Sequence, residues 1–112
     1  QITPDMVGAA ECHGTGTALG DPIELGALMG VLGAQRKNAP PLAFTTSKIN
    51  LGHTEAHAGM AGLAKCILCC TNGYSPPHNH LVSLSPHLHL DGFPAFVPTD
   101  ATDSGRTSDV IG

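Results

Sequence analysis

Glu11-Cys12-His13-Gly14-Thr15-Gly16-Thr17 is the most informative stretch of this chain, and Ser47-Lys48-Ile49-Asn50-Leu51-Gly52-His53 is its counterpart further along. Together the two stretches supply two histidines and one lysine, each in a turn that contains glycine. The short apolar run 6–10 precedes the first turn, and the run 42–46 precedes the second. Short apolar runs of this kind are typical of buried strands. We therefore expect two strands, each leading into a turn that carries ionisable side chains.

A helix is predicted directly after the first turn. Asp21 suits the N-cap, Pro22 suits the first helical position, and Glu24 can close a capping box. The apolar residues that follow recur at helical spacing and predict one buried face. They are Leu25, Leu28, Met29 and Leu32.

A second helix is predicted over about residues 55–71, with Thr54 as its cap. It is apolar on nearly all sides, so we expect it to be buried all round. From Asn72 onward frequent prolines predict an extended, irregular surface segment, and residues 106–112 could begin a last strand.

Composition excludes several classes of protein. The 112 residues suit one domain or part of one, and a net charge of −4 with only five Lys and Arg argues against nucleic acid or anionic membrane partners. The longest apolar run, 56–70, contains Lys65 and is too short for a membrane span. The four cysteines do not resemble a disulfide framework, which favours a reducing, intracellular setting, most simply the cytoplasm.

The two histidines are candidates for catalysis. Adjacent strand residues point to opposite faces, so Cys12 and His13 are poorly placed as a nucleophile and its base. His53 precedes the second predicted helix, whose positive end favours a neutral imidazole that can donate to an oxyanion. Lys48 lies in the same loop. The plainer alternatives are a structural His13, a simple tight Gly-Thr-Gly-Thr turn, and a surface lysine.

Metal binding is a further possibility that the residues leave open. Cys66 and Cys69 have a ligand spacing, with Cys70 beside them, but cysteines inside an apolar helix usually belong to a core. The pairs His78/His80 and His87/His89 lie in the proline-rich segment without a known ligand spacing around them. His57 falls in the first turn of the second predicted helix, where partial exposure is expected.

Four linked motifs resemble β-ketoacyl synthase (ketosynthase) domains, in a version closer to modular polyketide synthases than to free-standing fatty acid enzymes. The motifs are His13 to Thr17, Gly20 to Glu24, Ser47 to Glu55 and Ala58 to Gly62, and the resemblance covers about residues 6–98. It implies an α/β, thiolase-like layered fold (α-β-α-β-α) of which this chain is the C-terminal half only. Residues 1–112 would then be a partial ketosynthase domain, truncated at both ends.

The resemblance also implies roles for individual residues. His13 and His53 match the two catalytic histidines and Lys48 the motif lysine, while Thr15 and Thr17 match threonines that line the tunnel for the phosphopantetheine arm. No nucleophile and no metal ligand are expected in this stretch, and no cofactor is bound directly. The implied partners are acyl carrier protein, which carries the phosphopantetheine, the N-terminal half of the domain, and a second copy in a homodimer.

The chemistry so implied is decarboxylative Claisen condensation of a malonyl-type unit with an acyl thioester, in polyketide or fatty acid biosynthesis. No cysteine here has the family's nucleophile setting, so the fragment alone is expected to be inactive. His57 stands where alanine is common, which leaves substrate preference open. The alternatives are a non-elongating ketosynthase-like domain that gates acyl carrier protein without condensation, and a small metal-binding module.

Overall fold

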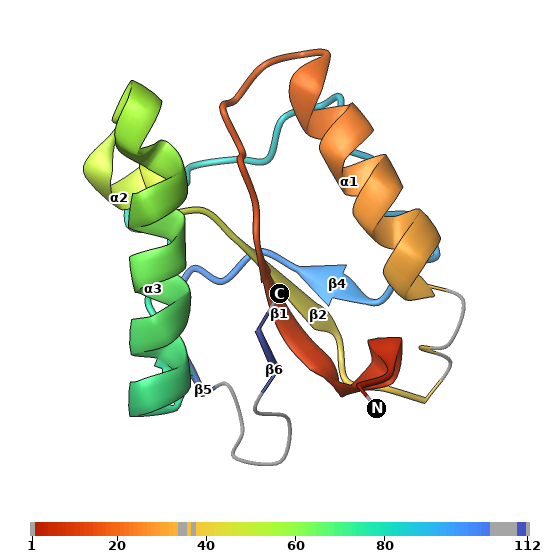
Figure 1. Ribbon diagram of the computed structural model, residues 1–112. Coiled ribbons are helices and arrows are strands. Elements are labelled where there is room, and N and C mark those ends of the chain that lie inside the picture. Colours follow the sequence, from red (N-terminus) through yellow and green to blue (C-terminus); the bar gives the residue numbers. More distant parts are fainter. Residues whose placement is uncertain (1, 34–35, 37, 104–109, 112) are drawn as a thin grey trace.

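A parallel sheet forms the centre of the molecule (Figure 1). The computed structural model describes residues 2–33, 36, 38–103 and 110–111. The strand order is β4-β2-β1-β6, and all neighbours run parallel. The strands are β1 (Val7–Glu11), β2 (Leu42–Thr45), β4 (Ala95–Phe96) and β6 (Val110–Ile111). The two strands predicted from apolar runs, β1 and β2, are thus confirmed as neighbours.

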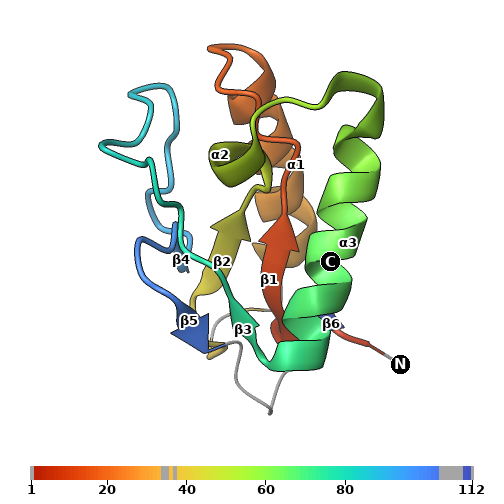
Figure 2. The ribbon, with the colours of Figure 1, turned by 90° about the vertical axis from the view of Figure 1, so that its left-hand side faces the viewer.

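Two helices cover the sheet from opposite sides, α1 (Gly20–Leu32) on one face and α3 (Ala58–Asn72) on the other (Figures 1 and 2). Helices on both faces are what a parallel sheet needs, because the connections between parallel strands cross over a face. A short helix, α2 (Lys48–Leu51), follows β2 directly. The chain therefore forms an α-β-α set of layers within the expected α/β class.

The face of the sheet towards α1 holds the larger apolar side chains. Leu42 is fully buried and Phe44 nearly so, and the ring of Phe44 stacks on Phe93 with 6.1 Å between centroids. Leu25 of α1 is buried against this face. The helical face predicted from the sequence is confirmed, because the other three members pack on the same cluster: Leu28, Met29 and Leu32.

The face towards α3 is built from small and polar residues instead. Ala9 and Ala43 lie opposite each other in register, followed by Glu11 opposite Thr45. These small side chains let the helix come close: a Cβ at Gly62 would lie 3.3 Å from Cγ of Glu11. The glycine in α3 thus allows a short distance between helix and sheet, in exchange for some helix propensity.

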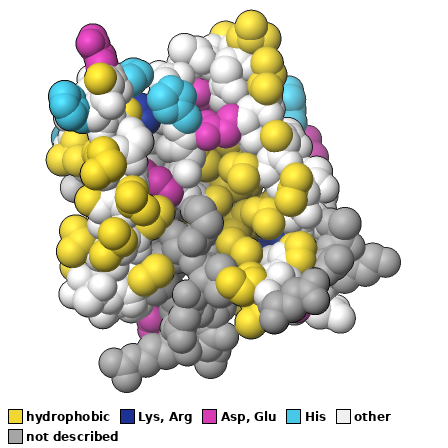
Figure 3. Space-filling view, viewed as in Figure 1, with side chains coloured by type: hydrophobic (Ala, Val, Ile, Leu, Met, Phe, Trp, Pro, Cys, Tyr) yellow, Lys and Arg dark blue, Asp and Glu magenta, His cyan; other side chains and the backbone are white. Residues whose placement is uncertain are grey.

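The prediction that α3 is buried all round was wrong for this chain. Ala58 and Cys69 are its buried residues, whereas large apolar side chains along it face solvent (Figure 3). The sheet covers only one stripe of the helix, so the remaining apolar side chains have nothing to pack on within the described residues. They are Met60, Leu63, Ile67 and Leu68, which are 54–68% exposed.

Both predicted helix starts were displaced. Helix α1 begins at Gly20, one residue before the expected cap, and its N-cap Leu19 makes no side-chain cap bond. The second helix begins with a 3-10 turn, η3 (Glu55–His57), and α3 proper starts at Ala58. Thr54 makes no cap bond either. At α1 the residues expected to cap the helix, Asp21 and Glu24, accept N–H groups of the preceding turn instead.

The segment after α3 is largely irregular, as predicted. It contains β4 and a small antiparallel pair, β3 (Tyr74–Ser75) with β5 (Thr102–Asp103). The possible last strand is present as β6, while the rest of the stretch predicted for it lies outside the described residues. In the described part of the chain no helix is long and apolar enough to cross a bilayer.

Candidate active site

The two motifs found in the sequence meet at one edge of the sheet. Parallel strands present their carboxyl ends at the same edge, where ligands of open α/β sheets usually bind. Residue His13 follows β1, and Lys48 is the first residue of α2 after β2. The amide of Cys12 donates to the carbonyl of Thr45 over 2.6 Å, which holds the ends of the two strands together.

His13 and His53 lie side by side, although they are far apart in the sequence. Their ring centroids are 5.6 Å apart and the rings are nearly perpendicular, at 89°. Both side chains are exposed. The edge of one imidazole is therefore turned towards the other ring at this end of the sheet.

The hydrogen bonding of His53 decides which ring nitrogen can donate. Its Nδ1 accepts the backbone N–H of Glu55 over 2.9 Å. In a neutral imidazole only one nitrogen carries a proton, so we infer that the proton is on Nε2, which is then free to donate. The sequence argument relied on the positive end of a helix directly after His53, but α3 starts only at Ala58. The hydrogen bond from the backbone N–H of Glu55 thus selects the tautomer of the neutral ring.

The backbone around His53 is unusual. Gly52 ends α2 with φ of 78°, and Glu55 has φ of 49°, the one positive value that the described non-glycine residues show. A side chain in this region of backbone space is uncommon and costs of the order of 1 kcal/mol or more. Strained residues of this type cluster at functional sites, which favours a role for the turn.

Two acidic side chains of α1 hold the His13–Thr17 turn. The carboxylate of Glu24 accepts the N–H groups of His13 and Gly14, the latter over 2.9 Å. The buried carboxylate of Asp21 accepts the N–H of Gly16 with both oxygens, at 3.0 Å and 3.2 Å. These residues were predicted to cap α1, and that prediction was wrong. They organise the turn because its unpaired N–H groups point at the helix.

Close packing also fixes this turn against the second motif. Gly14 has φ of 50°, and a Cβ there would lie 3.0 Å from Cβ of Thr46. The hydroxyl of Thr46 donates to the carbonyl of His13 and accepts the N–H of Lys48, each over 3.4 Å. Thr46 thus connects the segments of the two candidate catalytic residues.

Cys12 lies on the opposite side of the chain from His13, as strand alternation predicted. It points to the α1 face and is buried, while its neighbour His13 is exposed. Burial, and then the nearby carboxylates of Glu24 and Glu11, raise the pKa of the Cys12 thiol to about 12. The thiolate is the nucleophilic form of cysteine, so this side chain is unsuited to covalent catalysis near neutral pH.

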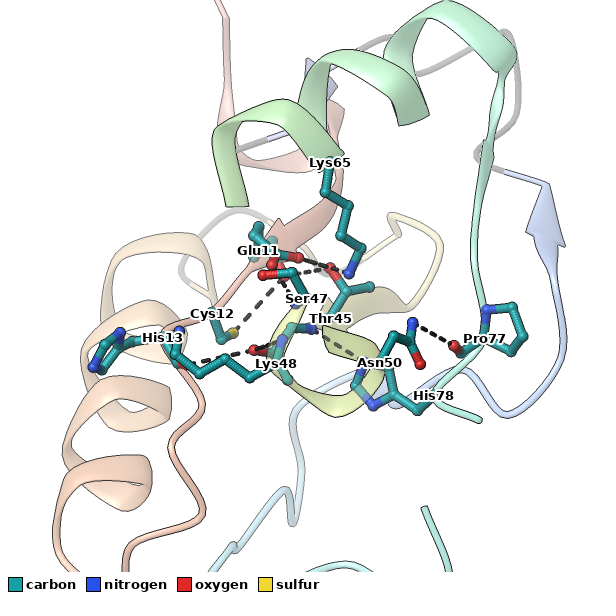
Figure 4. Close-up of polar contacts among 12 residues, drawn as sticks. Glu11, Cys12, His13, Thr45, Ser47, Lys48, Asn50, Lys65, Pro77 and His78 are labelled. Atoms are coloured by element: carbon teal, nitrogen blue, oxygen red, sulfur yellow. Dashed lines mark hydrogen bonds and ion pairs between the residues drawn. The ribbon is translucent and has the colours of Figure 1, made fainter. Parts of the chain in front are cut away.

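A hollow of about 290 Å³ lies between the end of β1, α2 and the start of α3. His13 and Lys48 both line it, and the Lys48 side chain runs towards the His13 segment (Figure 4). The remaining lining residues are Glu11, Cys12, Ser47, Ala58, Gly59, Gly62, Leu63 and Cys66. The hollow is large enough for a small polar reacting group beside His13.

Thr15 and Thr17 lie in the same turn as His13, next to the start of α1. Their hydroxyls are 3.3 Å apart, and that of Thr17 accepts the N–H of Gly20 over 3.1 Å. Thr17 is exposed and Thr15 half-buried. One hydroxyl of the pair is thus occupied by α1, and the other can meet an incoming polar chain.

Sequence reasoning missed an ion pair beneath the hollow. Lys65 of α3 contacts Glu11 of β1 over 2.7 Å, and the two side chains are only 11% and 8% exposed. Glu11 also accepts the hydroxyl of Thr45 over 2.7 Å and the N–H of Ser47, the residue before Lys48 (Figure 4). Glutamate at the end of a strand and lysine within an apolar helix were the available signals, but their pairing is not local.

The histidines and cysteines considered as metal ligands are spread apart. Among the described residues no group of three or more His, Cys, Asp or Glu side chains is close enough to hold a metal ion. Cys66, Cys69 and Cys70 are free thiols on α3. His57 ends η3 and is exposed. His78 is the exception in this group, because it is buried and bonded to Thr46.

The layered α/β fold is that of the thiolase-like class expected from the motifs, and the two histidines lie at the carboxyl edge of its sheet. Comparison with known proteins agrees. The family described as "Beta-ketoacyl synthase, C-terminal domain" matches residues 1–82. The chain therefore belongs to the β-ketoacyl synthase family, as a C-terminal stretch of a ketosynthase of the polyketide synthase type.

Two relatives of this chain are polyketide synthases, one from a fungus and one from a bacterium. The chain is 41% identical over 100 residues to a reducing polyketide synthase of Fusarium langsethiae, covering 88% of this chain and 4% of that protein. It is 49% identical over 87 residues to a phenolphthiocerol/phthiocerol polyketide synthase of Mycobacterium tuberculosis, covering 78% and 5%. The chain thus spans a small part of the length of these relatives.

Solved ketosynthases have the same structure over nearly the whole chain. The ketosynthase from module 1 of the bacillaene synthase of Bacillus amyloliquefaciens superposes with a TM-score of 0.84 at 37% identity, covering 94% of this chain and 20% of that one. An oxazolomycin ketosynthase domain of Streptomyces albus gives 0.82 at 34% identity, covering 93% and 18%. The thiolase-like fold expected from the motifs is confirmed.

Proposed function

We propose that residues 1–112 are part of a longer ketosynthase domain, and that they supply the histidines of its condensation site. The observation that carries the proposal is the perpendicular contact of His13 and His53, 5.6 Å apart, at the edge where Lys48 also lies. Solved ketosynthases of which this chain covers 18–20% support the longer domain. Within such a domain the chain contributes one side of the active site.

The reaction proposed is decarboxylative condensation of two thioesters. A malonyl-type thioester loses carbon dioxide, and the electron pair of the broken C–C bond forms an enolate. N–H groups of two neutral imidazoles would stabilise the enolate oxygen, and such preorganised donors are commonly a large term in catalysis. The enolate carbon then attacks the acyl thioester, and the nucleophilic cysteine leaves as thiolate. That cysteine would come from another part of the domain, because Cys12 is buried as a thiol.

The other residues of the site have supporting roles in this proposal. Lys48 would place a positive charge in the hollow beside His13. The hydroxyls of Thr15 and Thr17 would meet the phosphopantetheine arm that acyl carrier protein presents. The two hydroxyls lie in the same turn as His13, with Thr17 exposed and Thr15 half-buried, so the turn offers polar groups to such an arm.

The test uses the intact synthase and separates three steps: acyl loading of the nucleophile, decarboxylation of malonyl carrier protein, and condensation. We expect His13→Ala and His53→Ala to load acyl groups normally but to lose condensation by about a hundredfold or more. His87→Ala, an exposed histidine outside the site, is the matched control. Condensation at the wild-type rate in either site variant would refute the assignment.

Residues 1–112 alone are expected to give no condensed product from malonyl carrier protein and an acyl donor. The hollow is open and the nucleophile is not among the side chains that line it. Product formation above the enzyme-free rate would contradict the proposal that the site needs a further part of the domain.

A further inference from the structure

We propose that His78 is a positioning residue of the condensation site, because its imidazole holds the backbone turn that carries Lys48. The proposal rests on the proposed function for its catalytic consequence. His78 lies in the proline-rich segment, far from both motifs in the sequence. Nothing in the spacing of that segment indicates a role.

The imidazole of His78 faces the first residue after β2. Its Nε2 accepts the backbone N–H of Thr46 over 3.1 Å, and the residue is only 7% exposed. The backbone of His78 is itself fixed on both sides, since its N–H donates to Pro98 over 2.9 Å and its carbonyl accepts from Leu81 over 3.1 Å. The ring is therefore a rigid acceptor presented to the turn.

The neighbours of His78 hold α2 at a second point. The side-chain amide of Asn50 donates to the carbonyl of Pro77 over 3.1 Å and accepts the N–H of Asn79 over 3.3 Å. Residues 77–79 thus bond to Thr46 and Asn50, which lie on either side of Lys48 (Figure 4). Two such points set both the place and the tilt of α2.

The first of these contacts reaches the catalytic residues through Thr46. The Thr46 hydroxyl bonds to the carbonyl of His13 and to the N–H of Lys48, each over 3.4 Å. A shift of Thr46 would therefore move both segments together. Misplacement of reacting groups by about 1 Å can cost a hundredfold in rate. Without its acceptor, the part-buried N–H of Thr46 would also lose the bond that it makes here, which carries a cost.

The contact requires the neutral ring, because a protonated imidazole has no acceptor. Burial first, and then the charge of Lys65 on α3, lower the pKa of His78, against a smaller opposing effect of Glu11 on β1. The environment therefore keeps His78 in the accepting state near neutral pH. Acidification would convert its Nε2 into a donor that faces another donor.

Two substitutions separate these properties. His78→Leu keeps an apolar side chain of similar bulk without an acceptor, whereas His78→Gln offers an amide oxygen that does not titrate near neutral pH. His89→Leu and His89→Gln are the matched controls, since His89 is an exposed histidine of the same segment. All are made in the intact synthase.

The measurements are acyl loading, kcat and KM for condensation between about pH 5.5 and 8, and hydrogen exchange of the Thr46 amide. We expect His78→Leu to lower kcat about ten- to a hundredfold with loading and KM nearly unchanged. His78→Gln should keep most of the wild-type kcat, and its kcat should fall less at acid pH than that of the wild type. The Thr46 amide should lose protection in the leucine variant and keep it in the glutamine variant.

Wild-type kcat in His78→Leu would overturn the proposal, as would equal losses of kcat and thermal stability in both variants, which would mark His78 as merely structural. Unchanged protection of the Thr46 amide in His78→Leu would overturn the contact itself. A wild-type synthase that loads acyl groups but does not condense would instead refute the proposed function, and the catalytic consequence with it. The hydrogen-exchange result distinguishes these failures.

Discussion

Removing Lys65 should cost the ketosynthase domain much of its stability. The ammonium lies 2.7 Å from the Glu11 carboxylate, and the two side chains are 11% and 8% exposed. Lys65→Met keeps the length and apolar stem of the side chain but leaves Glu11 charged and buried. Breaking a buried pair in this way typically costs about 3–5 kcal/mol. Glu11 keeps its bonds from Thr45 and Ser47, so we expect about 3 kcal/mol, the lower end.

The measurement is the shift of the urea unfolding midpoint of the intact domain, with the m-value checked for constancy. The double variant Glu11→Gln/Lys65→Met is the control, because no charge remains buried and the carboxamide still has partners. Its oxygen can accept the N–H of Ser47, and its NH2 can donate to the Thr45 hydroxyl, which can donate to the carbonyl of Ala10. The double variant should recover to within about 1 kcal/mol of the wild type. A loss below about 1 kcal/mol in the single variant would show a solvated pair and refute the reasoning.

Three further predictions concern single residues. Cys12→Ala should leave condensation within about twofold of the wild-type kcat, because a thiol with pKa about 12 is not a nucleophile; a tenfold loss would contradict this. Gly14→Ala should destabilise the domain by about 1–3 kcal/mol in urea unfolding and lower kcat, since φ is 50° and the new Cβ would lie 3.0 Å from Thr46; full activity would show that the turn can relax. The folded state holds the pKa of His78 below its ordinary 6.5, so between the two values only the unfolded chain binds the proton. Stability from this group is therefore complete above about pH 6.5 and falls as the pH drops below it, and the midpoint of His78→Gln should lack that part of the slope; identical slopes would contradict it.

Local sequence patterns were sufficient to predict the two central strands and the buried face of the first helix. The apolar runs before the motifs became β1 and β2, and the spacing from Leu25 to Leu32 gave the buried face of α1. These predictions succeed because the central strands are covered on both faces, whereas α1 buries a single apolar face against the sheet. The opposite directions of Cys12 and His13 followed from strand alternation in the same way.

The errors came where a side chain had a distant partner that was better than its local one. Asp21 and Glu24 fit a capping pattern, but their carboxylates accept N–H groups of the preceding turn instead of capping the helix. The helix after His53 starts late because Glu55 takes a left-handed backbone conformation, which no propensity of glutamate indicates. The hydrogen bonds and backbone conformation of the site therefore determine where α1 and α3 begin, and the helix propensities of their residues do not.

The candidate site was found in part. His13, His53 and Lys48 come together at the sheet edge, as the motifs suggested. The residues that hold them, Glu11 with Lys65 and His78 with Thr46, pair across long stretches of chain. A single sequence has no periodicity that encodes such pairs, so they became visible only in three dimensions.

The two faces of the sheet differ in the size of their buried side chains. Leu42 and Phe44 face α1, whereas Ala9 and Ala43 face α3. The two interfaces should therefore tolerate opposite kinds of change. On the α1 side, trimming a side chain opens a void, whereas adding a methylene on the α3 side pushes the helix off the sheet. Beneath α1, substitutions of one large apolar residue by another should be tolerated. Beneath α3 only alanine and glycine should be tolerated, because the helix that carries Lys65 must stay within reach of Glu11.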